Sequence, residues 1–116
     1  MSLKLAMEAL KSIGLTETEA KVYVYLAKEG PLEEKELANT LKLTNNQLTI
    51  SLEMLLAKGM VNAIPESSTK YFAIAFEKVL DQFMETTKKQ AKDLQASKEE
   101  ILSTWRSMVG KYSANS

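Results

Sequence analysis

The sequence predicts a mainly α-helical fold with one small β-hairpin and a long C-terminal helix. Apolar residues recur at helical spacing through the N-terminal half, where two capping boxes mark the starts of helices. Two short runs with strand character follow, separated by a polar loop. Beyond them neither Gly nor Pro occurs between Phe76 and Gly110, which leaves room for one uninterrupted helix.

The composition excludes several classes of function. The chain has 116 residues, of which 15 are basic and 15 acidic, and it contains neither Cys nor His. The lack of both residues excludes disulfides, thiolate or imidazole metal sites, and catalysis by Cys or His. No Gly-rich phosphate loop is present, and adjacent carboxylates such as Glu33 and Glu34 diverge on the surface of a solvated helix. We therefore expect no enzymatic activity, no cofactor and no metal.

The sequence also lacks signals for a membrane or for secretion. No apolar run approaches the ~20 residues that a membrane-spanning helix needs. The N-terminus has a short, broken apolar pattern that includes Glu8, which is not typical of a secretory signal. We therefore expect a cytoplasmic protein without a membrane partner.

Four helices are expected in the N-terminal half. The first covers Leu3–Ile13, and the second begins at the capping box of Thr16 and Glu19 and continues to about Lys28.

The third and fourth helices form the element on which the functional argument depends. The third is expected over Glu33–Leu41, and the fourth begins at the capping box of Thr44 and Gln47 and runs from Asn45 to about Lys58. Only three residues separate these two helices, which is the spacing of a helix-turn-helix.

A β-hairpin follows the fourth helix. Its strands are expected at Met60–Ile64 and Lys70–Ile74, with residues 65–69 as a polar tip. The order helix, helix, helix-turn-helix and hairpin is that of a winged helix-turn-helix domain, which we assign to residues 1–75.

The last helix, expected from Phe76 to about Val109, carries a narrow apolar seam. Nine positions alternate at spacings of four and three, as in a coiled coil, and Thr87 and Lys98 are the only polar ones. Either this helix folds back over its own domain, or it pairs with a second copy, and the narrow seam favours the pair. We therefore assign residues 76–110 to dimerisation and residues 111–116 to a disordered tail. The apolar seam positions are Leu80, Met84, Ala91, Leu94, Ile101, Trp105 and Met108.

Several segments resemble one family of regulators. Ile13–Tyr23 reads Ile-Gly-Leu-Thr-Glu-Thr-Glu-Ala-Lys-Val-Tyr, Gly30-Pro31 precedes the helix that contains Lys35–Ala38, and Leu52–Val61 and Phe76–Leu80 follow. In these segments the chain, from Leu10 to Leu80, resembles the N-terminal DNA-binding domain of the TrmB family of transcriptional regulators, which are common in archaea. The resemblance implies a winged helix that binds double-stranded DNA. Larger family members continue into a sugar-holding effector domain, whereas here a long helix follows, so no ligand site is carried over.

In such a domain the N-terminal part of the fourth helix meets base edges in the major groove. Asn and Gln can pair with adenine, and Ile or Thr can contact the methyl group of thymine. The residues expected to meet bases are Asn45, Asn46, Gln47, Thr49 and Ile50.

The phosphate backbone is expected to meet lysines of the helix-turn-helix and the polar tip of the hairpin. Residues 1–75 contain eight Lys, no Arg and nine Glu, so this surface is weak in positive charge, and Glu53 opposes a phosphate. The expected backbone contacts are Lys35, Lys42, Thr44, Lys58, Ser67, Ser68, Thr69 and Lys70.

Two other interpretations of the fourth helix stay open. Its polar residues can simply be the solvated face of a core helix. Alternatively, Ile50, Met54 and Ala57 form a second apolar edge, and the domain is a protein–protein assembly module that uses this edge and the C-terminal helix.

Overall fold

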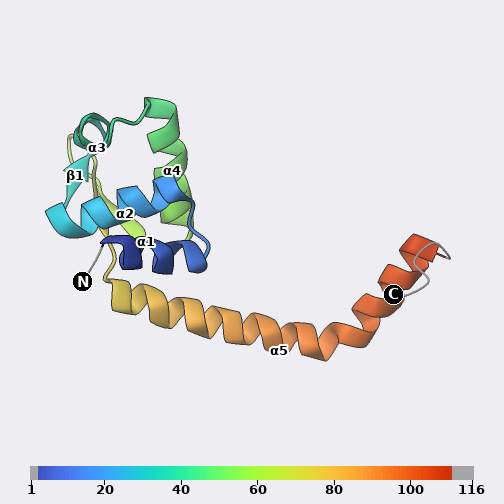
Figure 1. Ribbon diagram of the computed structural model, residues 1–116. Coiled ribbons are helices and arrows are strands. Elements are labelled where there is room, and N and C mark those ends of the chain that lie inside the picture. Colours follow the sequence, from blue (N-terminus) through green and yellow to red (C-terminus); the bar gives the residue numbers. More distant parts are fainter. Residues whose placement is uncertain (1–2, 111–116) are drawn as a thin grey trace. The chain divides into compact units, whose positions relative to one another are not determined.

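The computed structural model describes residues 3–110 (Figure 1). Contacts divide the chain into two units, one ending at Leu80 and the other beginning at Asp81. The tail assigned from the sequence to residues 111–116 lies outside the described residues.

The first unit contains four helices, a small sheet and the start of a fifth helix, in the order expected for a winged helix. Each expected helix is present, with ends within two residues of the predicted ones. The helices are α1 (Leu3–Ser12), α2 (Glu17–Glu29), α3 (Glu34–Leu41), α4 (Asn45–Ala57) and α5 (Phe76–Val109).

The sheet has three strands rather than the two of a hairpin. The strands β1 (Leu32–Glu33), β2 (Val61–Ile64) and β3 (Lys70–Ala73) are antiparallel in the order β1-β3-β2. The third helix was expected to begin at Glu33, which is wrong by one residue because Glu33 pairs with Lys70 in the sheet. This register fixes the hairpin against the start of α3.

Leucines from four helices form most of the core. Ser51 and the carboxylate-bearing Glu19 are also buried in it. The largest fully buried apolar side chains are Leu10, Val22, Leu26, Leu37, Leu48, Leu52 and Leu55.

The first turn of α5 packs on this core. Val79 is buried within the cluster, and the ring of Phe76 lies 6.4 Å from that of Tyr23. The Tyr23 hydroxyl donates a 2.6 Å hydrogen bond to the carbonyl of Ile74, just before α5 begins. Leu80 is half-buried, so the winged-helix unit includes the start of the long helix.

In the second unit α5 is exposed along nearly its whole length. Its apolar seam faces solvent, with Met84, Leu94, Ile101, Trp105 and Met108 each between 46% and 74% exposed. Within residues 3–110 no helix is both long and apolar enough to cross a membrane.

Candidate nucleic-acid interface

One face of α4 is buried and the other is exposed, as its sequence predicts. Leu48, Leu52 and Leu55 are buried, whereas Asn46 and Ile50 are exposed. Gln47 and Thr49 are exposed as well, and so is Asn45 at the start of the helix. The five residues expected to meet bases therefore lie together on the exposed N-terminal part of α4.

A capping box holds the start of this helix. The Thr44 hydroxyl oxygen accepts a hydrogen bond from the Gln47 amide nitrogen at 3.1 Å, and the Gln47 side-chain oxygen accepts one from the Thr44 amide nitrogen at 3.0 Å. The cap satisfies two backbone donors that a helix N-terminus leaves open.

The capping box limits what Gln47 can do with a base. Reading adenine through two hydrogen bonds needs both the oxygen and the nitrogen of the amide. The Gln47 oxygen is already an acceptor for Thr44. This hydrogen bond holds the Gln47 side chain toward Thr44 and occupies one of the two lone pairs of its oxygen, so its NH₂ group is the freer of its two polar groups, while the Thr44 hydroxyl proton is free to donate.

Asn45 and Asn46 are not restricted in this way. Neither side-chain amide makes a hydrogen bond to any residue between 3 and 110. Both can donate and accept, so these two amides have the full chemistry of base reading.

The lysines of the helix-turn-helix are unpaired and exposed. Lys42 has a left-handed backbone (φ 56°, ψ 44°) at the turn between α3 and α4, and Lys35 lies in the first turn of α3. Neither has a carboxylate within 4.0 Å among the described residues. Both ammonium groups are available to an anion.

The hairpin lysine has acidic neighbours. Lys70 Nζ lies 4.0 Å from a Glu66 oxygen, and its partner across the sheet is Glu33. The Glu66 carboxylate thus competes with a phosphate for this ammonium group, and Glu33 on the neighbouring strand adds negative charge nearby.

The hairpin tip adjoins the start of α3. Ser68, Thr69 and Lys35 line one shallow hollow, together with two glutamates and Tyr71. The Tyr71 hydroxyl donates to Glu34 at 3.3 Å, and burial together with the Glu34 carboxylate raises the pKa of Tyr71. Lys35 and two of the three tip hydroxyls are therefore brought together, but beside negative charge. Ser67 is exposed and does not line this hollow.

Lys58 is held elsewhere. Its ammonium group donates to a carboxylate oxygen of Glu19 at 2.9 Å and to the carbonyl oxygen of Gly14 at 3.2 Å. It lies at the end of α4 opposite to the reading residues, about 20 Å along the helix axis from Asn45. Lys58 is therefore not among the phosphate contacts that we propose, because its charge already stabilises a buried carboxylate.

The site holds no cluster of metal ligands. Within residues 3–110 no group of three or more acidic side chains is placed to hold a metal ion. The polar groups of this face are amides, hydroxyls, a few ammonium groups and the carboxylates beside the hairpin.

Solved structures share this fold. A protein from the thermoacidophilic archaeon Sulfolobus tokodaii is 22% identical, with a TM-score of 0.65 over 80% of this chain and 98% of that one. TrmBL2, an archaeal chromatin protein with a novel mode of DNA binding, is 24% identical, with a TM-score of 0.77 over 92% of this chain and 41% of that one. A MepR mutant of S. aureus bound to an oligodeoxyribonucleotide is 14% identical, with a TM-score of 0.57 over 91% and 86%. At these identities the likeness establishes the winged-helix fold alone.

The sequence itself matches one family. A search of the curated proteins finds no match. The family model described as "Sugar-specific transcriptional regulator TrmB" matches residues 10–77, which is more than half of the chain. Members of this family are regulators and not enzymes, in agreement with the expectation from composition. By this match, and by its winged-helix fold, the chain belongs to the TrmB family of transcriptional regulators.

Proposed function

We propose that this regulator binds double-stranded DNA as a homodimer, with the start of α4 in the major groove and the hairpin tip along the backbone. The observation that carries the proposal is the pair of uncommitted amides, Asn45 and Asn46, on the exposed first turn of the second helix of a helix-turn-helix. In this motif the N-terminal residues of that helix contact base edges. MepR is bound to an oligodeoxyribonucleotide and TrmBL2 binds DNA in a novel mode, so both support DNA as the partner of this fold.

The residues proposed to meet bases contribute in different ways. Asn45 and Asn46 read bases through both amide atoms, and Gln47 contributes mainly a donor because its oxygen already accepts a hydrogen bond in the capping box. Thr49 and Ile50 supply apolar contact to a thymine methyl.

Phosphate contacts come mainly from Lys35, Lys42 and Thr44. The Thr44 hydroxyl lies at the N-terminus of α4, where the helix dipole favours an anion. Ser67, Ser68, Thr69 and Lys70 on the hairpin add weaker contacts, since Lys70 shares its charge with Glu66.

The dimer forms through α5. Its exposed seam is a row of apolar side chains that water would otherwise contact, and pairing of two such helices buries them. Shallow hollows along the helix between Ala91 and Ile101, and between Ile101 and Met108, are the shapes into which side chains of a partner helix fit. In this scheme residues 1–75 bind DNA, residues 76–110 dimerise, and the protein acts in the cytoplasm.

The test is selection of bound sequences from a random duplex pool at two salt concentrations, followed by Asn46→Ala on the preferred site. Loss of the amide should cost roughly 1–3 kcal/mol there and leave binding to unrelated duplexes unchanged. Asn39→Ala, an exposed amide on α3 outside the proposed contacts, is the matched control. If Asn46→Ala does not change the preference among sequences, α4 does not read bases.

A second candidate function rests on the apolar edge of α4. Ile50 is 53% exposed and Met54 is 43% exposed, four positions apart on one side of the helix. In a protein-assembly module these two would be anchors, so Ile50→Asp would abolish partner binding while Asn46→Ala would have no effect. Ile50→Asp would also repel phosphate, so Asn46→Ala is the variant that separates the two functions.

A further inference from the structure

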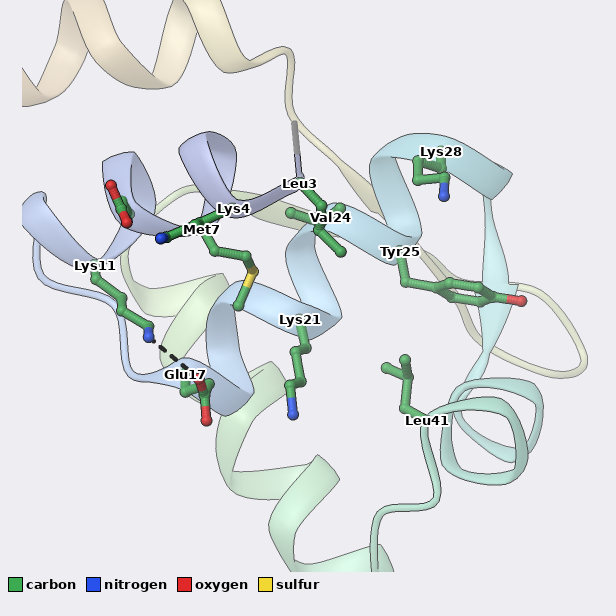
Figure 2. A pocket seen from close by; sticks show the side chains of 11 residues that line it. Leu3, Lys4, Met7, Lys11, Glu17, Lys21, Val24, Tyr25, Lys28 and Leu41 are labelled. Atoms are coloured by element: carbon green, nitrogen blue, oxygen red, sulfur yellow. Dashed lines mark hydrogen bonds and ion pairs between the residues drawn. The ribbon is translucent and has the colours of Figure 1, made fainter. Parts of the chain in front are cut away.

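A groove on the first unit is lined by none of the residues proposed to contact DNA. It has a volume of about 650 Å³ and lies between α1, α2 and the end of α3. Figure 2 shows its apolar lining, which includes Met7 from α1, Val24 and Tyr25 from α2, and Leu41 from α3. A volume of this size is within the range of small-molecule sites.

Lysines border this apolar floor in a regular way. On α1, Met7 lies between Lys4 and Lys11, and on α2, Val24 and Tyr25 lie between Lys21 and Lys28. Within each pair the lysines are seven positions apart, so they lie on one side of the helix about 10.5 Å from each other. Each helix therefore presents an apolar stretch with an ammonium group at both ends.

The groove is positively charged although the chain as a whole is neutral. Four lysines line it against two glutamates, Glu8 and Glu17, which gives a local net charge of +2. Lys11 pairs with Glu17 at 3.1 Å. Within residues 3–110 the ammonium groups of Lys4, Lys21 and Lys28 have no carboxylate within 4.0 Å. Three of the four ammonium groups thus border the apolar surface without a direct ion pair among the described residues, and the two glutamates offset only part of the charge.

We propose that this groove binds an amphiphilic carboxylate, an anion whose apolar chain lies on the Met7–Val24–Tyr25–Leu41 floor and whose carboxylate meets Lys21 or Lys28. Met7, Val24 and Leu41 offer no hydrogen-bonding group to a phosphodiester or a sugar, and Tyr25 offers only its hydroxyl (Figure 2). A second copy docked symmetrically through the same groove would bring one +2 face against another, which like charges oppose. A ligand with an apolar chain and one carboxylate fits both the apolar floor and the lysines that border it.

The groove adjoins the helix-turn-helix. Leu41 is the last residue of α3, and Thr44, which caps α4, follows three positions later. A ligand in the groove therefore contacts the helix end from which the reading helix is positioned.

The test is an NMR titration of the ¹⁵N-labelled full chain with sodium decanoate below its micelle concentration, with decan-1-ol as the uncharged probe. We expect saturable shifts at the amides of the four floor residues, with decan-1-ol binding about fivefold more weakly. Lys21→Ala and Lys28→Ala should each weaken decanoate binding about two- to fivefold. Both lysines are exposed, and Lys35→Ala, an exposed lysine outside the groove, should have no effect.

A substitution that only loosened the fold would weaken the binding of both probes to the same extent. The proposal therefore requires that the lysine variants weaken decanoate binding and leave decan-1-ol binding unaltered. Three results would overturn it. One is the lack of saturable shifts at the floor residues, and another is equal affinity for the two probes. The third is shifts at these amides that depend on protein concentration without ligand, which would mean that a second copy occupies the groove.

Discussion

The ion pair between Lys58 and Glu19 leads to a prediction that separates stability from DNA binding. The sequence suggests Lys58 as a phosphate contact, but its ammonium group is bound to a carboxylate that is almost completely buried. Lys58→Met keeps most of the apolar stem and removes the charge. We expect this variant to be less stable and, while folded, to bind DNA as well as the wild type.

The expected loss of stability follows from the burial of the pair. Removing one partner from a fully buried ion pair costs about 3–5 kcal/mol, whereas an exposed pair contributes about 0–1 kcal/mol. The Glu19 side chain is 6% exposed and that of Lys58 30% exposed, so the pair is intermediate. Glu19 also keeps its 3.1 Å hydrogen bond from the Thr16 amide nitrogen. We therefore expect the free energy of unfolding to fall by about 1.5–3 kcal/mol.

Urea denaturation measures this loss, and a double-mutant cycle assigns it to the pair. Glu19→Gln combined with Lys58→Met should show a coupling energy of about 1–2 kcal/mol. DNA affinity is then measured at several salt concentrations under conditions where every variant is folded. Lys42→Met is the matched control, because it removes an unpaired lysine from each subunit and should lower the salt dependence of the dimer by about two units, one for each lysine lost.

The opposite pattern would refute the reasoning. If Lys58→Met unfolds at the same urea concentration as the wild type and lowers the salt dependence as Lys42→Met does, Lys58 contacts phosphate and the ion pair is not a stabilising contact. Equal effects on both properties would mean that the pair and the DNA compete for the same ammonium group.

Two further predictions concern the core and the seam of α5. Tyr23 is 3% exposed, and burial raises the pKa of its hydroxyl above the usual value of about 10; the stability that this group contributes is therefore complete below pH ~10 and is lost as pH rises through the folded-state pKa. Tyr23→Phe should lower the melting temperature at pH 8, because a hydrogen bond worth about 1 kcal/mol is lost. The melting temperature of this variant should also fall less between pH 9 and 11 than that of the wild type. An equal fall in both proteins would contradict the prediction. Leu94→Glu combined with Ile101→Glu should convert a dimer into a monomer with an unchanged winged helix, and sedimentation that finds the wild type monomeric at micromolar concentration would disprove pairing through α5.

The helices could be predicted from sequence because their signals are local. The capping box of Thr16 and Glu19, and that of Thr44 and Gln47, each lie within four residues, and both are present in the structure. The apolar spacing of α4 likewise placed Leu48, Leu52 and Leu55 in the core. Local hydrogen bonds and periodicity do not depend on how the rest of the chain is arranged.

The strand β1 and the Lys58 ion pair could not be found in this way. β1 has only two residues, too few to show a period, and it exists because Leu32 and Glu33 pair with β3. Lys58 and Glu19 are 39 positions apart, and nothing in the sequence links them. For Gln47 the sequence suggests two roles, capping the helix and reading bases. The 3.0 Å hydrogen bond shows that its oxygen is used for capping.

The low positive charge around the start of α4 determines how strongly DNA binding by this regulator depends on salt. Binding to duplex DNA loses affinity with salt in proportion to the cations that contact phosphates, with a slope of about −0.9 for each one. Each helix-turn-helix offers two unpaired lysines to DNA, Lys35 and Lys42, so a dimer should show a slope of about −4. Binding to arbitrary DNA is then weak, and neutral groups such as Asn45 and Asn46 carry a large share of the affinity for the correct site. Titrations between low and high salt measure this slope. A slope of about −6 or steeper would mean that another basic surface binds DNA, and the cluster of Lys88, Lys89 and Lys92 on α5 would then be the first surface to mutate.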